Sequence, residues 1–138
     1  MGNRFTHPDD AYVLTIPDGW EVEELSHTHA FFHPDTGVGA VNISVMSPKP
    51  EMPMPLAKAI IGEFIPRNAT IEGSASLSAQ SNELNRAFAK YSKSSKAWRL
   101  WVICGQTRIV VVTYNCDQSR EGIEDEQVDA LVASIRAA

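Results

Sequence analysis

The sequence predicts an α/β fold of the α+β type, a three-layer α/β/α sandwich around a central antiparallel sheet. The strongest observation is the run AWRLWVICGQTRIVVVTYNC over residues 97–116, which has the pattern of two long strands and is apolar on both faces. Shorter β-like runs precede it, and two segments with helical spacing of apolar residues can cover the two faces. For 138 residues we expect one domain over residues 1–138.

The first third of the chain is expected to form a meander of antiparallel strands. Turns separate the strands at residues 17–19 (Pro-Asp-Gly) and 34–37 (Pro-Asp-Thr-Gly), because proline presets φ and glycine accepts a positive φ. Trp20 and Val22 have the spacing of inward-facing residues. The predicted strands are Tyr12–Ile16, Trp20–Leu25, Thr28–His33 and Val38–Met46.

The middle of the chain begins with four prolines between residues 48 and 55, which exclude a helix interior or a central strand. Residues 47–55 are therefore expected to form an extended surface connection. A helix is predicted over Leu56–Ile65, where Pro66 ends the pattern. A strand within residues 69–77, a serine-rich turn within residues 74–82 and a strand over Leu84–Ser92 complete this part.

The long hairpin is predicted to turn at Gly105-Gln106, with Cys104 opposite Thr107. That register places the thiols of Cys104 and Cys116 roughly 30 Å apart, so no disulfide joins them. Both faces of the hairpin are apolar, and both are expected to be covered. The final helix is predicted to begin near Ser119 or Glu121 and to run to Arg136.

Composition narrows the partner class and the location. A net charge of −5 and a pI of about 5.3 argue against a nucleic-acid partner. No run of 18 apolar residues is present and the first ten residues lack a secretory signal, so we expect no membrane partner and a cytoplasmic location. Nucleophile-elbow, dinucleotide-binding and P-loop motifs are absent, so we expect no catalytic residue and no cofactor.

Three histidines form the first candidate binding surface. His27, His29 and His33 have the same parity in an extended run and would share one face of a strand. His29 and His33 are about 13 Å apart in a strand, too far to bind one ion. His27 and His29 could converge, but no Cys, Asp or Glu in the local run completes a tetrahedral set, so no metal site is expected. The alternative is a solvated strand face, with Thr28, Ala30 and Phe32 turned inward.

Met52 and Met54 form the second candidate binding surface. They alternate with prolines in a segment that cannot join a ladder, and exposed methionines suit adaptable recognition. The alternative is that both side chains pack over the end of the sheet.

Four stretches carry a resemblance to a known fold family: residues 12–20 (YVLTIPDGW), 31–45 (FFHPDTGVGAVNISV), 98–105 (WRLWVICG) and 112–116 (VTYNC). With a closing helix to Arg136, this order resembles the fold shared by the photosystem extrinsic subunit PsbP and the Ran-binding protein Mog, a fold that small bacterial proteins also have. The resemblance implies an antiparallel sheet between helices and a family without known catalytic residues. Its motifs are structural, so no binding residue is transferred.

We therefore expect a non-enzymatic, bacterial protein-binding module of an accessory, adaptor or immunity type, whose partner is another protein. The contact residues expected are Met52, Met54, His27, His29 and His33. The alternative is a small-ligand-binding protein, or an enzyme whose site is assembled from distant residues. A homodimer formed through an open sheet edge is a third possibility.

Overall fold

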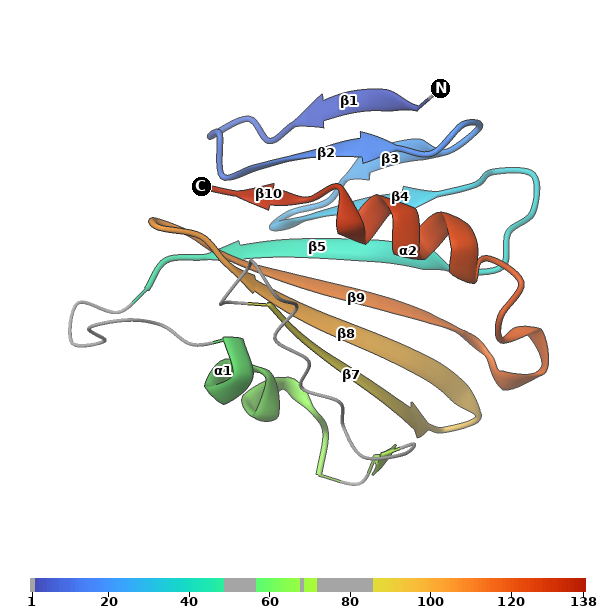
Figure 1. The fold of residues 1–138 in the computed structure, drawn as a ribbon. Helices are drawn as coiled ribbons and strands as arrows, with labels where there is room; N and C mark the ends of the chain where they lie inside the picture. The colour runs from blue at the N-terminus through green and yellow to red at the C-terminus, as the bar shows by residue number, and fades with distance from the viewer. Residues whose placement is uncertain (1, 49–56, 68, 72–85) are drawn as a thin grey trace.

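The computed structural model describes residues 2–48, 57–67, 69–71 and 86–138 (Figure 1). These residues form two antiparallel sheets, one with the strand order β3-β4-β5-β9-β8-β7-β6 and one with the order β1-β2-β10. The N-terminal strands are β1 (Asn3–Thr6), β2 (Tyr12–Ile16), β3 (Glu21–Glu24), β4 (Thr28–Phe32) and β5 (Ala40–Met46). The remaining elements are α1 (Ala57–Phe64), β6 (Thr70–Ile71), β7 (Arg86–Lys93), β8 (Lys96–Cys104), β9 (Ile109–Asp117), the 3-10 turn η1 (Gln118–Arg120), α2 (Asp125–Ala133) and β10 (Arg136–Ala137).

The predicted hairpin is confirmed, but its register is shifted by two residues. Cys104 lies opposite Ile109, not Thr107, so residues 105–108 form the loop. The loop is longer because it holds the last strand: the N–H groups of Thr107 and Arg108 donate to the carbonyl oxygen of Ala138. A shift of two residues leaves every side chain on its predicted face, because the side-chain period of a strand is two. Both cysteines are free, as predicted.

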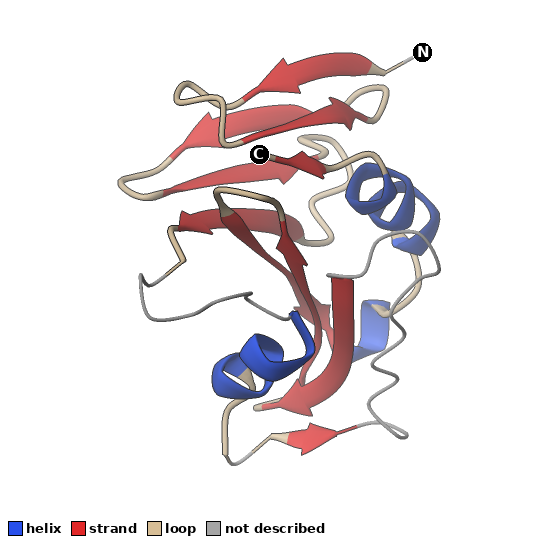
Figure 2. Cartoon of the chain, turned by 60° about the vertical axis from the view of Figure 1, so that its left-hand side comes forward, coloured by secondary structure: helices blue, strands red, loops and turns tan. Residues whose placement is uncertain are grey.

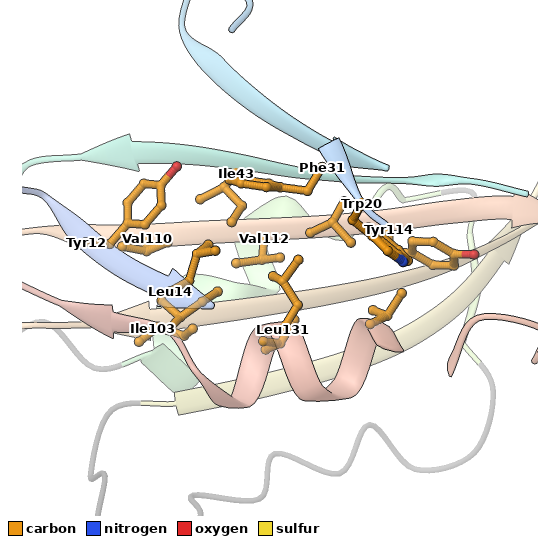
Figure 3. Packing of buried hydrophobic residues seen from close by; sticks show 14 of the residues in the cluster. Tyr12, Leu14, Trp20, Phe31, Ile43, Ile103, Val110, Val112, Tyr114 and Leu131 are labelled. Atoms are coloured by element: carbon orange, nitrogen blue, oxygen red, sulfur yellow. The ribbon is translucent and has the colours of Figure 1, made fainter. Parts of the chain in front are cut away.

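The first core lies between the large sheet and a mixed layer formed by the small sheet and α2 (Figure 3). Val110 and Val112 of β9 and Phe31 of β4 face this core, and each is fully buried. Leu14 of β2 and Leu131 of α2 close it from the other side. Burying such side chains contributes about 1.5–3 kcal/mol each, so this layer is a main source of stability.

The second core lies on the opposite face of the large sheet, under α1. Ile60 and Ile61 of α1 pack with Leu100 and Val102 of β8 and with alanines of β7. Figure 2 shows α1 and α2 on opposite sides of the sheet. The prediction that both faces of the hairpin are covered is confirmed, because residues of β8 and β9 lie in both cores.

The sequence prediction missed the small sheet. Residues 3–6 were not expected to form a strand, yet β1 pairs with β2 along its whole length. The final helix is shorter than predicted: it ends at Ala133, and Arg136–Ala137 pair with β2 as β10. The α+β class and the central antiparallel sheet are confirmed, but one outer layer combines a sheet with a helix.

Strand β3 also differs from its prediction. It ends at Glu24, and all four of its residues are exposed, including Val22, which was expected to face inward. Trp20, which precedes it, is buried as predicted. The reason is position: β3 is the edge of the large sheet, beyond the reach of α2.

Candidate functional site

The candidate site is a hollow of about 480 Å³ at the end of the molecule where several connections meet, on the left of Figure 1. The connection from β1 to β2 and the turn from β3 to β4 form its walls, β5 contributes its last residues, and Arg108 comes from the loop between β8 and β9. The lining residues are His7, Pro8, Asp9, Ala11, Glu24, Leu25, Ser26, His27, Thr28, His29, Ile43, Val45, Ser47 and Arg108.

His29 is the most enclosed polar residue of this hollow, with 8% of its surface exposed. Its ring contacts those of Phe5 and His7, with centroids 5.3 and 5.4 Å away. Its Nε2 lies 3.6 Å from a carboxylate oxygen of Glu24. The predicted solvated face is therefore wrong for His29, because β1 lies over this face of β4 and places Phe5 against it.

The three predicted histidines do not converge. His27 is exposed on the turn between β3 and β4 and lines the hollow with His29. His33 follows the other end of β4, where its Nδ1 accepts hydrogen bonds from the backbone N–H groups of Asp35 and Thr36. Its role in the structure is to hold the turn before β5.

Ala30 and Phe32, predicted to face inward, lie on the opposite face of β4 from His29 and Phe31. Ala30 is buried and Phe32 is half-buried. Both faces of β4 are thus partly covered. Because apolar residues occur on both faces, the sequence of this strand alone does not indicate that the face of Phe31 bears the main core.

His7 replaces His33 as the third imidazole of the hollow. Its Nδ1 accepts a hydrogen bond from the backbone N–H of Asp9. Partial burial and the neighbouring His29 lower the pKa of His7, with Arg108 acting in the same direction and Asp9 and Glu24 opposing it. The sequence held no signal for this residue, because its position depends on the unpredicted strand β1.

The hollow does not have the arrangement of a metal site. Within the described ranges, no group of three or more His, Cys, Asp or Glu side chains could hold a metal ion. The Nδ1 lone pair of His7 is already used by the backbone. What the hollow presents is imidazole, carboxylate and guanidinium groups around an apolar floor of Ile43 and Val45.

A second hollow, of about 400 Å³, lies between α2 and the strands β7 and β8. The guanidinium of Arg99 lies over the rings of Phe88 and Trp101, 5.6 and 4.8 Å from their centroids. Arg99 also pairs with the carboxylates of Asp125 and Asp129. These contacts hold α2 on the sheet, so we assign this cluster a structural role.

A third polar cluster joins the start of α2 to the sheet. Glu124 is 5% exposed, and its two carboxylate oxygens accept hydrogen bonds from Tyr114 (2.8 Å) and Thr36 (3.0 Å). Burial raises the pKa of Tyr114, and the bond to Glu124 raises it further. Each carboxylate oxygen has a neutral donor, which satisfies the buried group without a cation.

The cysteines are not activated nucleophiles. Burial raises the pKa of Cys104 to about 11 and also raises that of Cys116, whereas reactive thiols have lowered values. Met52 and Met54 lie outside the described residues, so the contact predicted for them stays a prediction. In the described part of the chain, no helix is long and apolar enough to cross a membrane.

No family model and no curated protein matches this chain. Among solved structures, cyanobacterial PsbP (CyanoP) from Synechocystis superposes with a TM-score of 0.68 at 10% identity, covering 98% of this chain and 91% of that one. The Ran-binding protein Mog1p of Saccharomyces cerevisiae gives 0.62 at 8% identity, covering 99% and 95%.

This chain has the PsbP/Mog1-like fold. LpqN of Mycobacterium tuberculosis, a protein involved in cell envelope biogenesis, has it too, with a TM-score of 0.62 at 16% identity over 98% of this chain and 89% of that one. A Bacteroides thetaiotaomicron protein gives 0.67 at 14% identity, and this chain spans 48% of its length. The superpositions establish a shared fold, and identities of 8–16% do not extend the likeness to function.

Proposed function

We propose that this chain is a non-enzymatic protein-binding module whose contact surface is the hollow between the β1–β2 connection and the β3–β4 turn. The observation that carries the proposal is the turn between β3 and β4. Leu25 is 44% exposed there, beside the exposed His27, on the rim of a hollow that also contains His29. Single exposed apolar residues are common on protein surfaces, and what distinguishes Leu25 is its place on the rim of a hollow that also contains imidazole, carboxylate and guanidinium groups.

The composition of the hollow supports this proposal. Ile43 and Val45 of β5 supply apolar surface, while Arg108 and the exposed His27 supply polar groups around the enclosed His29. Protein interfaces combine an apolar centre with a polar rim, and arginine is enriched among the residues that dominate binding energy. In this proposal the protein is a cytoplasmic adaptor or immunity-type protein of a bacterium, and its partner is another protein.

The test compares two exposed apolar residues that are far apart in the chain. Leu25→Asp places a charge on the rim of the hollow, and Ile123→Asp places one at a site where the native side chain is 59% exposed. Stoichiometric capture of a partner from the native host should be lost with Leu25→Asp and kept with Ile123→Asp. If no stoichiometric partner is recovered, or if Leu25→Asp captures it as well as the native chain does, the proposal fails.

A second candidate is the binding of a small anionic molecule in the same hollow. Its volume of about 480 Å³ lies in the range of ligand pockets, and Arg108 and His7 converge there. Citrate at millimolar concentration should then raise the melting temperature of the native chain and leave that of Arg108→Ala unchanged. An equal rise in both proteins would point to a general salt effect and exclude this candidate.

A further inference from the structure

Strand β3 presents an open edge next to the hollow. It is the terminal strand of the large sheet in the described part of the chain, and it pairs with β4 alone. All four of its residues are exposed, and it leads directly into Leu25 on the rim of the hollow. An open edge carries unpaired backbone donors and acceptors that can accept another strand.

The hydrogen-bond pattern shows which backbone groups are open. The N–H of Leu25 donates to the carbonyl of Thr28, which makes this a hydrogen-bonded pair. Such pairs alternate along antiparallel strands, so Glu23 and Glu21 also bond to β4. The N–H and C=O groups of Val22 and Glu24 therefore point away from the sheet, and they form a template for a new strand.

The side chains of this edge define the chemistry of the occupant. Glu21 and Glu23 share one face of the strand, while Val22 and Glu24 share the other, where Val22 is 38% exposed. A strand added here would place its alternate residues next to two carboxylates on one face. Opposite charges on neighbouring strands stabilise pairing, and like charges destabilise it.

The same side chains disfavour a second copy of this chain at this edge. Antiparallel pairing through the outward groups allows three central registers. Val22 opposite Val22 sets Glu21 against Glu23, Val22 opposite Glu24 sets Glu23 against Glu23, and Glu24 opposite Glu24 is itself a like-charge pair. Each register places carboxylates directly opposite each other, so the edge is protected from self-association.

We propose, building on the proposed function, that β3 receives an extended basic segment of the partner protein by strand addition. Lysine or arginine residues at alternate positions lie beside Glu21 and Glu23, and a small apolar residue packs on Val22. The backbone of the segment pairs with the outward groups of Val22 and Glu24. Because β3 runs into the rim at Leu25, the added strand leads into or out of the hollow.

The experiment uses two blocked synthetic peptides, Lys-Val-Lys-Val-Lys-Val-Lys-Val and its counterpart with glutamate in place of lysine, added to the whole chain. The basic peptide should bind saturably at millimolar concentration, and amide exchange at Val22 and Glu24 should slow by about tenfold while Glu23 changes little. The acidic peptide should not bind. Unchanged exchange at Val22 and Glu24 under saturation, equal binding of the acidic peptide, or no saturable binding would overturn the proposal.

Two variants test the backbone and the charges separately. Val22→Pro removes an outward N–H and leaves the ladder to β4 intact, and Val22→Thr is its matched control because it keeps the N–H. Val22→Pro and the double variant Glu21→Lys/Glu23→Lys should each weaken peptide binding by about tenfold or more, and Val22→Thr should not. Equal binding by all variants would refute strand addition.

The failure of this inference is distinguishable from that of the proposed function. If a partner is captured through Leu25 and its capture is unaffected by Val22→Pro, strand addition is wrong, and the proposed function as a protein-binding module is still supported. The single variant Glu23→Lys turns the Glu21–Glu23 pairs of the Val22 register into opposite-charge pairs, so self-association of this variant in light scattering, where the native chain does not associate, shows that the carboxylates act against dimers. If the native chain itself dimerises and Val22→Pro abolishes the dimer, the occupant is a second copy and the inference fails.

Discussion

Replacing Tyr114 by phenylalanine tests the polar cluster that joins α2 to the sheet. Tyr114 is 3% exposed, and its hydroxyl donates to Glu124 at 2.8 Å. The substitution removes the donor and keeps the ring, so the cost is that of a buried hydrogen bond to a carboxylate. Such bonds contribute about 1.5–3 kcal/mol, because the carboxylate loses a partner that water cannot replace.

The cluster also predicts how the substitutions combine. In a Glu124→Leu background the Tyr114 hydroxyl has lost its acceptor, so Tyr114→Phe should cost nothing or even stabilise the protein. The coupling energy between the two sites should therefore be about 2 kcal/mol. Thr36→Val should cost less, about 0.5 kcal/mol, because Thr36 is exposed and its hydroxyl can turn to water.

Urea unfolding of the four proteins of this cycle gives the free energies. A loss of about 2 kcal/mol in Tyr114→Phe corresponds to a fall in Tm of about 5–8 °C. Thr36→Ser, which keeps the hydroxyl, is the control for the loop between β4 and β5. Additive effects of Tyr114→Phe and Glu124→Leu, or a cost of Tyr114→Phe below about 0.5 kcal/mol, would show that this hydrogen bond does not hold α2.

Three further predictions concern the turn, the thiols and the end of α2. Ser94 and Ser95 have φ of +54° and +64°, so Ser95→Gly should raise the free energy of unfolding by about 1 kcal/mol in urea, and a loss of stability would contradict this reading of the turn. Burial raises the pKa of Cys104 to about 11 and also raises that of Cys116. The protonated thiols therefore contribute fully to the free energy of unfolding below about pH 9, and this contribution is lost as the pH rises toward 11. Tm measured across this range should fall, and it should fall less steeply in Cys104→Ala. Arg86 donates to the carbonyls of Val132 and Ile135, so Arg86→Met should cost about 1–3 kcal/mol and speed amide exchange in α2 and β10, whereas native exchange rates would exclude this role.

The hairpin could be predicted from the sequence because its apolar pattern indicates two buried strands even when the position of the turn is predicted wrongly. Apolar residues occupy both parities of residues 97–116, which indicates burial on both faces whatever the turn. The register was wrong by two residues, yet Trp98 and Trp101 still lie in different cores, as their parity predicts. The loop length could not be predicted, because the end of β10 determines it through Thr107 and Arg108.

The small sheet could not be predicted because its signals are not local. Ile135 continues the helical spacing of Val128, Leu131 and Val132, and it is fully buried, but it lies beyond the end of α2. Pairing with β2 determines the conformation of the following two residues. A strand of two residues is too short to show an alternating pattern of apolar residues, so its conformation depends on tertiary contacts.

The candidate site was predicted in part, for the same reason. His27 and His29 do line one hollow, but they are joined by His7 and not by His33. The alternation of side chains along a strand predicts that His27, His29 and His33 share one face. It does not show that β1 covers this face only near the start of β4, where Phe5 contacts His29. The missing information was the position of β1, which the sequence of residues 3–6 does not reveal.

The small sheet also explains why the hollow and the open edge lie together. β1 reaches far enough across the large sheet to bury His29 and Phe31 under Phe5, but β3 has no described strand beyond it. Val22 therefore faces the side of the first core and yet stays exposed, and Leu25 stays exposed at the rim of the hollow. The incomplete cover of one sheet by the other thus creates the surface on which both proposals depend.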